Sequence, residues 1–600
     1  MKSRTTAIWF MLALALVAAI WVLNTYFQPA ATGERPLFPG LHANRVTSIQ
    51  IIPGGEREID AIYTNKTWQL QRPFVYPAQQ TAIEGLLGTL EKLTPVLSFS
   101  PSEMSGKKNA DAELGFDSPQ FSLDLTAGEQ TWHVRVGRKT APGDGVYVQV
   151  VGAPGAYVTD VNWLQFLPHD ANVWRDTTLV DMPDVVDWLV ITNGSQAIEL
   201  RRDITNRLWR MVRPLQARAN DLLILTALQQ LHTAKVSHFV TDDPKADPTT
   251  YGLVPAALDV WLGTGTNLIT GIHAGKEITG LTGEVYARRE GWNSVVATAK
   301  EPLAPWRGKV NDFRDPNLLK LTAPVAEIEV QGQTKETSFT LQKQGSNSWT
   351  IVGQKFPTDA ERVDSFVRTL ASLRIADFAQ DVVTGPGLQS FGLASPSRQI
   401  TLRSIAGNTN SVIAQLLFGT STTNQIYVKR ADEVFVYAIT LDDLNRLPQG
   451  GDFFRDPQIW NFSETNVAQV TMQQNGKTRQ FLRTGNKQWS LGANSQGIID
   501  PRAIEDSVHR LGQLAAYAWI GRDFNDANLG LSTNSLSVTM EMKSGEKYSV
   551  NFGGVLPLPS LNTRTPLAVV TLDGERWAFV FPPVLFPLIQ EYFTIPSDTP

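Results

Sequence analysis

The chain has 600 residues, of which 42% are hydrophobic and 18% charged, and it carries a formal net charge of -5 and no cysteine. This length exceeds what one hydrophobic core supports, so several domains are expected, and the composition is that of a folded protein. The mildly acidic balance argues against general nucleic-acid binding, and the lack of cysteine excludes disulfides, thiol catalysis and thiolate metal sites.

The first segment has the pattern of a membrane anchor. Lys2 and Arg4 precede an unbroken apolar run over residues 7–23, with Trp9 and Trp21 near its two ends. A helix of this run would be roughly 25 Å long, at the short end of a bilayer span, and tryptophans favour the membrane interfaces. The pattern predicts a transmembrane anchor within residues 1–27 that contacts the membrane through residues 7–23.

A cleaved secretory signal is the alternative interpretation of this segment. Such signals usually have a shorter apolar region and an A-x-A-like cleavage site, which the residues before Ala30 and Ala31 do not provide. Both interpretations export the rest of the chain. With the basic residues held on the cytoplasmic side, we expect a single-pass protein of the cell inner membrane whose bulk is periplasmic. Residues 28–44, rich in proline, glycine and alanine, are predicted to be a tether.

The body of the chain is an internal repeat. Four tryptophans, each followed by a loop and an amphipathic helical pattern, are separated by 141, 140 and 140 residues: Trp68, Trp209, Trp349 and Trp489. A fixed period of this kind indicates tandem units. The sequence therefore predicts four repeat units, at residues 45–182, 183–322, 323–463 and 464–600.

Each repeat is predicted to combine short strands with one helix. Strand patterns fall at residues 46–52, 58–63, 67–70, 120–125, 131–136, 146–150, 188–192, 197–201, 208–212 and 399–403. Apolar residues spaced by three or four give each helix one buried face, formed by Ile83, Leu86, Leu87, Leu90 and Leu93, by Ile224, Leu228 and Leu231, by Val363, Phe366, Val367, Leu370 and Leu373, and by Ile504, Val508, Leu511 and Leu514. Asn220 or Asp221 can cap the start of the second helix. The third helix is expected to open at Thr358 or Asp359, and the fourth at Asp500-Pro501, where a proline at the first helical position costs no hydrogen bond.

The predicted fold class is therefore α+β. We expect an N-terminal transmembrane helix followed by four tandem repeats, each a β-rich unit with an amphipathic helix packed on antiparallel strands. The repeat tryptophans could form a carbohydrate platform, but each lies in an apolar alternation beside a strand, so core packing is the preferred interpretation.

Glycines recur at two places in each repeat. One lies in a loop after the helix, at Gly115, Gly252, Gly392 and Gly530, and the other near the end of a later strand, at Gly137, Gly275, Gly419 and Gly553. The loop glycine is expected to supply a backbone conformation that other residues resist. The second repeat departs from the pattern, because its strand-glycine end is less clear.

The first three repeats each end in an aromatic residue followed by Arg-Asp. These motifs are Trp174-Arg175-Asp176, Phe313-Arg314-Asp315 and Phe454-Arg455-Asp456, and the fourth repeat stops before the equivalent position. Because the motif occurs only where another repeat follows, our hypothesis is that it builds the joint between repeats, with the aromatic residue packing and the arginine bridging to acceptors. A solvated turn is the alternative.

The sequence provides no constellation from which a reaction can be inferred. No two of the seven histidines have the spacing of a helical metal pair, and His232 and His238 fall on a helix end and a following strand. The paired acids Asp242-Asp243 and Asp442-Asp443 point in different directions, and a helix start explains the second pair. We therefore predict no catalytic, cofactor-binding or metal-ligating residues, and no cofactor.

The repeat plan resembles the bacterial family called domain of unknown function 4340. The resemblance rests on SWTIVGQKFPTDAERVDSFVRTLASL at residues 348–373 with Phe391-Gly392-Leu393, and on weaker counterparts in the other repeats. Members of that family are similar to envelope proteins often encoded beside auxiliary components of gliding-motility-type ABC transporters. The resemblance implies a partner role and supplies no catalytic residues.

The expected function is that of a membrane-anchored, extracytoplasmic, non-enzymatic interaction or scaffold protein, an accessory to an ABC-type transporter or to envelope assembly. Its partners would be proteins of the membrane or envelope, including ABC transporter subunits, and not nucleic acid. The alternative is an envelope glycan-binding protein or hydrolase with a site in one diverged repeat or at a joint between repeats.

Overall fold

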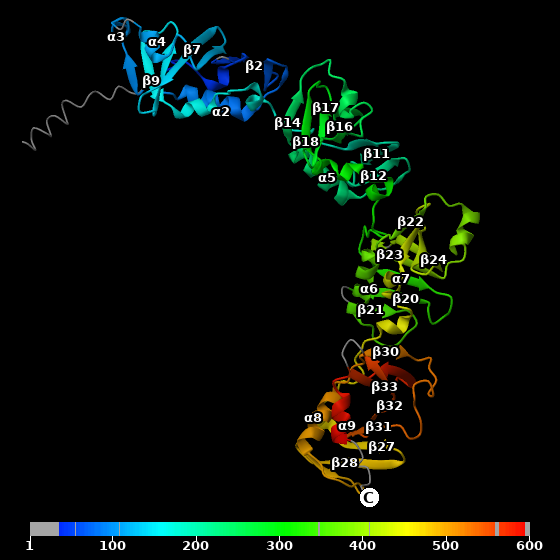
Figure 1. Ribbon diagram of the computed structural model, residues 1–600. Helices are drawn as coiled ribbons and strands as arrows, with labels where there is room; N and C mark the ends of the chain where they lie inside the picture. The colour runs from blue at the N-terminus through cyan, green and yellow to red at the C-terminus, as the bar shows by residue number, and fades with distance from the viewer. Residues whose placement is uncertain are drawn as a thin grey trace, which may run out of the picture. The chain divides into compact units, whose positions relative to one another are not determined.

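The computed structural model describes residues 35–593 except 55, 107–108, 346–347, 407–408 and 559–562. The chain divides into two compact units, Met1–Asp315 and Pro316–Pro600, and each is described by itself. Each unit contains two antiparallel sheets, which follow one another along the chain in the colour order of Figure 1.

The first unit contains two nine-stranded sheets. The first sheet is formed by β1 (Ser48–Pro53), β2 (Ile59–Thr64), β3 (Thr67–Arg72), β4 (Tyr76–Pro77), β5 (Leu97–Phe99), β6 (Phe121–Ala127), β7 (Gln130–Lys139), β8 (Gly145–Val150) and β9 (Ala156–Asp160), with helices α2 (Gln80–Glu91), α3 (Pro101–Ser105) and α4 (Ala110–Leu114). The second is formed by β10 (Trp188–Asn193), β11 (Gln196–Arg202), β12 (Trp209–Arg213), β13 (Ala217–Arg218), β14 (Val236–Thr241), β15 (Leu258–Thr264), β16 (Asn267–Glu277), β17 (Glu284–Arg289) and β18 (Val295–Ala299), with helix α5 (Asp221–Thr233).

The second unit contains two eight-stranded sheets. The third sheet of the chain is formed by β19 (Glu327–Gln331), β20 (Phe339–Gln344), β21 (Ser348–Ile351), β22 (Asp377–Gln380), β23 (Arg398–Ala406), β24 (Thr409–Ser421), β25 (Gln425–Arg430) and β26 (Val436–Thr440), with α6 (Ala360–Ser372) and α7 (Leu441–Asn445). The fourth is formed by β27 (Val467–Gln474), β28 (Lys477–Gly485), β29 (Gln488–Leu491), β30 (Ala518–Gly521), β31 (Ser537–Met542), β32 (Lys547–Leu558), β33 (Thr563–Leu572) and β34 (Glu575–Val580), with α8 (Pro501–Gly512) and α9 (Phe586–Phe593).

All four sheets have the same topology. In the first sheet the strand order is β4-β3-β2-β1-β6-β7-β8-β9-β5, so two meanders meet where β1 pairs with β6. The helix between the meanders connects one edge strand, β4, to the opposite edge strand, β5, and therefore runs across one face of the sheet. Its buried residues join the core, so each repeat has one covered face and one outer face.

The helices follow the predicted stripes. Every residue of the stripes on α2 and α8 is buried, and on α5 and α6 only Leu228 and Val367 are partly exposed. Asn220, Asp359 and Asp500 accept hydrogen bonds from backbone N–H groups of the first helical turn, as expected of capping residues. The predictions of these helices and of their starts are confirmed.

The repeat tryptophans lie in the cores. Trp68, Trp209, Trp349 and Trp489 retain between 2% and 5% of their exposure, which leaves no platform for a sugar. Core packing is therefore the correct interpretation. In the fourth repeat the indole N–H of Trp489 also donates to the buried carboxylate of Glu505 at 2.8 Å.

The recurring glycines form a contact between a loop and a strand. Gly115 has a φ of 86°, and a Cβ on Gly137 would lie 2.1 Å from the carbonyl oxygen of Leu114. The same pairing occurs in the second repeat, where a Cβ on Gly275 would lie 2.1 Å from the carbonyl oxygen of Tyr251. The structural interpretation of the glycines is confirmed, and the second repeat does not depart from it.

The predicted fold class is wrong. The described residues are mostly antiparallel strands with few helices, and none of those helices is long and apolar enough to cross a membrane. The main helix of each repeat has only 12 or 13 residues, against the roughly 20 that a span requires. Sequence patterns overstate the helix, because its apolar stripe is the longest periodic signal and strands of two to six residues leave little trace. The tandem repetition itself is confirmed.

The same finding contradicts the predicted single-pass location in the inner membrane. Residues 7–23, on which that prediction and the predicted membrane contact depended, lie outside the described residues, as does the first part of the predicted tether. Each of the four sheets falls within one predicted repeat unit, and the limits of those units stay a prediction.

Candidate functional site: the joints between repeats

The three aromatic–Arg–Asp motifs, here called the straps, run beside the loop that starts the helix of their own repeat. The backbone N–H groups of Asp176, Asp315 and Asp456 donate to the carbonyl oxygens of Pro77, Arg218 and Pro357 at 2.9, 3.0 and 2.9 Å. The aromatic residues Trp174, Phe313 and Phe454 have no exposed surface and belong to the core of that same repeat. The aromatic residue therefore packs in the core of its own repeat and anchors the strap there.

The strap arginines are buried. Arg175, Arg314 and Arg455 retain 0%, 2% and 5% of their exposure, so the alternative of a solvated turn is wrong. A buried guanidinium loses its hydration and must recover that free energy from acceptors or aromatic faces nearby. Arg175 and Arg455 find them in the following repeat.

Arg175 forms an ion pair across the joint between the first two repeats. Its two terminal nitrogens donate to the two carboxylate oxygens of Asp242 at 2.9 and 2.6 Å, in a bidentate arrangement. Ser294 accepts from the same guanidinium at 3.1 Å and donates to Asp242 at 2.6 Å, while Asn172 of the first repeat accepts at 3.2 Å. Bidentate arginine–carboxylate pairs fix geometry as well as energy, so this contact sets the register of the joint.

Aromatic rings surround the same guanidinium. The carbon Cζ of Arg175 lies 4.1 Å from the ring centres of Phe74 and Tyr76 and 3.6 Å from that of Phe239, which belongs to the second repeat. A second arginine, Arg289, reaches back to the first repeat and donates to Asp176 at 3.2 Å. Burial raises the pKa of Tyr76, whose hydroxyl lies beside Arg289 in this cluster of two arginines and two aspartates.

Arg455 crosses the joint between the third and fourth repeats in a different way. Its Cζ lies 4.0 Å from the ring centre of Trp577 and 5.0 Å from those of Trp519 and Phe356. Trp519 also donates its indole N–H to the carbonyl oxygen of Asp456 at 3.2 Å. Burial lowers the pKa of Arg455, which is the expected effect of an apolar environment on a cation.

Equivalent positions of the two joints differ in charge. Asn172 and Asp452 both lie three residues before the strap arginine. The residue two positions after each strap, Thr178 or Gln458, forms a β-bridge to Lys235 or Ala515 of the following repeat. Asp242 and Arg522 both lie seven residues after that bridge partner. In the first joint the acid is on the following repeat. In the later joint it is Asp452 on the preceding repeat, 3.5 Å from Arg522, and burial raises its pKa.

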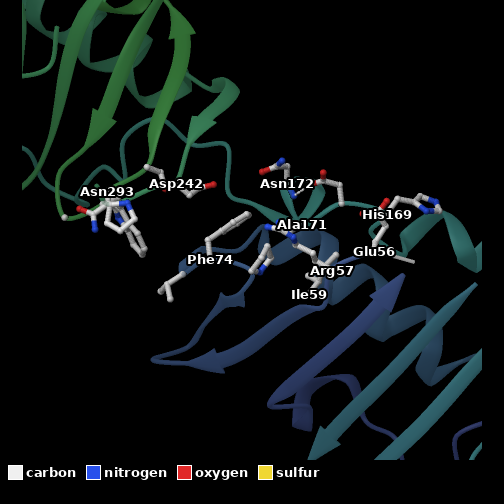
Figure 2. Close-up of a pocket in the computed structure, with 16 residues that line it drawn as sticks. Glu56, Arg57, Ile59, Phe74, His169, Ala171, Asn172, Asp242 and Asn293 are labelled. Carbon is white, nitrogen blue, oxygen red and sulfur yellow. Dashed lines mark hydrogen bonds between the residues drawn. The ribbon is translucent and has the colours of Figure 1, made fainter. Parts of the chain in front are cut away.

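A cleft opens at the joint of the first two repeats. It has a volume of about 720 Å³, and Figure 2 shows Phe74, Asn172 and Asp242 at its centre. The first repeat contributes Glu56, Arg57, Ile59, Pro73, Phe74, Val75 and His169–Asn172, and the second contributes Asp242, Pro244 and Gly291–Ser294. Three of these residues, Asn172, Asp242 and Ser294, are partners of Arg175, so the cleft and the joint share their polar groups.

The helix start predicted for Asp442-Asp443 is confirmed, whereas the role of Asp242 at the joint was not predicted. Asp242 holds the strap arginine, and Asp243 accepts the backbone N–H of Lys245 at 2.9 Å. Asp442 and Asp443 lie in the first turn of α7, where Thr440 caps the helix. Neither pair provides two carboxylates that face a common substrate.

The histidines occupy separate places. His232 ends α5 and His238 lies in β14, as predicted, and within the described residues no group of three or more ligand side chains could hold a metal ion. His273 bridges Asp259 at 2.6 Å and Glu290 at 2.7 Å on the outer face of the second sheet. The hydrogen bond to Asp259 raises the pKa of His273, so the imidazolium links three strands as a structural cation.

The topology and the joints define a tandem array of antiparallel-sheet repeats linked by buried arginines. The chain belongs to the family described as Domain of unknown function (DUF4340), whose model matches residues 68–205, 209–386 and 349–534. Each match begins on a repeat tryptophan, so the family unit extends from that tryptophan strand through the strap and into the next repeat. The predicted membership of the family is confirmed. No curated protein and no solved structure matches the chain.

Sequence reasoning found the strap arginines but not their acceptors. Phe239, Asp242 and Ser294 follow Arg175 at separations of 64 to 119 residues, and only the pairing of strands brings them together. The internal repeat contained a usable signal, because aligning the repeats places Asp242 opposite Arg522 and Asn172 opposite Asp452.

Proposed function

We propose that this protein is a non-enzymatic interaction protein whose straps couple consecutive repeats, so that side chains of two repeats form one binding surface. The observation that carries the proposal is the bidentate pair of Arg175 with Asp242, which lies at the base of the cleft between the first two repeats. Burying a cation at a contact between repeats costs desolvation free energy that an apolar contact would not. The presence of Arg175 here therefore suggests that the geometry of this joint matters for function.

The cleft has the character of a recognition site for a protein segment. Phe74 and Trp292 are partly exposed rings on opposite repeats, and Val75 retains 54% of its exposure beside them. Asn172 and Asn293 are exposed amides that can donate and accept hydrogen bonds. Apolar anchors with a few convergent polar groups, at the boundary of two domains, are the usual composition of a binding site.

The partner class that we propose is a protein of an ABC-type transporter or of an envelope assembly, as the family resemblance implies. Coupled repeats suit such a role, because two repeats held together within one compact unit offer a partner a larger joint surface than either repeat alone. The proposal concerns the repeats alone and assigns no reaction to them.

A photoreactive phenylalanine analogue in place of Asn293 tests this proposal in cells. We expect a discrete protein adduct from position 293 and none from Glu129, an exposed residue of the β6–β7 turn that serves as the matched control. A second variant, Arg175→Met, should reduce the adduct at position 293, because the two sides of the cleft lose their connection. Equal labelling at both positions, or no protein adduct at either, would contradict the proposal.

A glycan ligand is the second candidate, and the same cleft favours it. Phe74 and Trp292 could stack on sugar faces while Asp170, Asn172 and Asn293 meet hydroxyl groups. Calorimetric titration with soluble cell-wall fragments distinguishes the two candidates. Binding that is lost in Trp292→Ala and kept in Trp261→Ala, a control on the outer face of the same sheet, would favour the glycan over the protein partner.

A further inference from the structure

A row of arginines crosses the outer face of the second sheet, away from the joint cleft. Arg201 on β11 lies directly opposite Arg210 on β12 in the strand register, and Arg210 lies directly opposite Arg218 on β13. Trp188 on β10 lies next in the same row and pairs with Arg201, whose Cζ is 3.6 Å from its ring centre. Strands alternate their side chains, and Leu200 and Met211 beside this row are buried under α5, so the row points to the uncovered face.

The row is not required by the fold. In the other three repeats the residue after the repeat tryptophan is Gln69, Thr350 or Ser490, and its partners across the strands are Ile62, Gln342 and Leu482. Like charges directly opposite one another on neighbouring strands are destabilising. The second repeat alone accepts this cost at positions where its homologous repeats have no charge.

Neighbouring charges do not cancel the row. Residues 196–213 contain five arginines and two acids, in a chain whose net charge is -5. Arg201 and Arg213 share the carboxylate of Glu199 at 3.3 and 3.4 Å, and Arg218 forms an ion pair with Asp315, so two acids face the four arginines. Arg210 is exposed, and Arg213 retains 79% of its side-chain exposure. The face is therefore locally basic within an acidic protein, which is the condition for attracting an anionic partner.

The spacing of the row identifies the shape of that partner. Neighbouring strands lie about 4.8 Å apart, whereas side chains on one face of an extended chain repeat every 6.6 to 6.8 Å, by rough geometry. The Cβ atoms of residues three or four apart on a helix lie about 5 to 6 Å from one another, which is closer to the spacing of the strands that carry the arginines. Guanidinium groups also bind carboxylates in a planar, bidentate manner.

From this spacing and charge we propose that the outer face of β10–β13 in the second repeat docks an acidic helical segment of a partner protein. Aspartates or glutamates along one side of the partner helix bind Arg201 and Arg210, with Arg213 at the rim and Trp188 packing against the aliphatic part of the helix. This surface is separate from the joint cleft, so a negative result for the acidic helix would leave the proposed binding of a partner in the cleft untouched, and the reverse also holds.

The test uses the full-length protein and a fluorescent alanine-based helical peptide of about 20 residues with glutamates four apart. A peptide of the same composition with glutamates two apart is the paired probe. We expect the first peptide to bind more tightly at low salt, and Arg201→Gln/Arg210→Gln to weaken that binding about tenfold or more. The control Arg135→Gln/Lys139→Gln removes the same charge from exposed positions of the first sheet and should change affinity by less than about twofold.

Circular dichroism of each variant verifies folding, and Arg210→Glu, at one exposed site, provides a second variant that should abolish binding. Equal affinity for the two peptides, or equal losses in the test and control variants, would overturn the proposal. Stronger arginine-dependent binding to dextran sulfate or to vesicles of phosphatidylcholine and phosphatidylglycerol would assign the face to another class of anion and would also overturn it.

Discussion

The two joints that lie within compact units contain the same strap, but the arginine of each strap has different partners. In the first, Arg175 is held by a carboxylate and a hydroxyl of the following repeat, Asp242 and Ser294. In the later joint, Arg455 lies against Trp519 and Trp577 of the following repeat. Trp577 takes the place of Ser294, since Ser294 lies two residues before the partner of Phe239 and Trp577 lies two residues before the partner of Trp519.

The comparison shows that the burial of the arginine is kept while its partners change. A buried guanidinium can be stabilised by hydrogen-bonded ion pairing or by aromatic faces, and the chain uses one solution in each joint. The charge at the position of Asp242 became positive in Arg522, and the acid moved to Asp452 on the other side of the joint. Each joint therefore matches its own pair of repeats, and exchange of repeats between joints would bring like charges together.

The largest effect is expected from removing the ionic arginine. Arg175→Met should destabilise the first joint by about 2–4 kcal/mol, because Asp242 and Ser294 lose their partner while the pair is only partly open to water. Native-state hydrogen exchange measures this at Val236, whose amide donates to Thr177 of the connecting segment at 2.7 Å. Unchanged protection of Val236 would mean that the ion pair does not hold the joint.

The charge exchange can be transplanted from one joint to the other. Asp242→Arg should destabilise the first joint by about 2–3 kcal/mol, because it unpairs Arg175 and adds a like charge. The further change Asn172→Asp recreates the arrangement of Asp452 and Arg522 and should restore about 1 kcal/mol of the lost stability. Protection of β14 amides provides the measurement, and a double variant no more stable than the single one would break the comparison.

The aromatic joint should depend less on its arginine. Arg455→Met keeps an apolar side chain against Phe356 and Trp577 and loses the cation–π interaction, worth about 1–2 kcal/mol. Exchange at Ala516, whose amide donates to Pro457 at 2.7 Å, reports the opening of this joint. A loss as large as that of Arg175→Met would show that the two joints do not differ in mechanism.

The smallest effect concerns pH. Burial raises the folded-state pKa of Asp452, so the folded joint binds a proton more readily than the unfolded chain does. Stability at this joint should therefore increase as pH falls through that raised pKa. The Asp452→Asn variant, which has no carboxylate to protonate at this position, should not show this increase. The difference in exchange protection at Ala516 between the two proteins, followed from neutral to mildly acidic pH, gives the sign directly.

Features that depend on local sequence could be predicted from the chain alone. The helix stripes and the loop glycines are set by residues a few positions apart, the tryptophan period is visible along the chain itself, and each was predicted correctly. The overall balance of strand and helix was not, because edge strands such as β4 and β13 have two residues each and leave no periodic trace.

The candidate site was predicted only in part. The arginine of each strap was identified from its position at the end of a repeat, whereas Asp242 lies 67 residues beyond Arg175 and contacts it only because β14 pairs with β18 at the edge of the next sheet. The cleft is likewise formed by five separate segments, from the β1–β2 turn to the β17–β18 turn. No local pattern indicates which of these segments meet.

The strap arginine of the first joint couples one repeat to the next through its partner in that repeat. A double-mutant cycle with Arg175→Ala and Asp242→Ala, followed by native-state exchange at Val236, measures this coupling directly. The account predicts a coupling free energy of about 1.5–3 kcal/mol between the two side chains. Additive effects, with a coupling below about 0.5 kcal/mol, would contradict it.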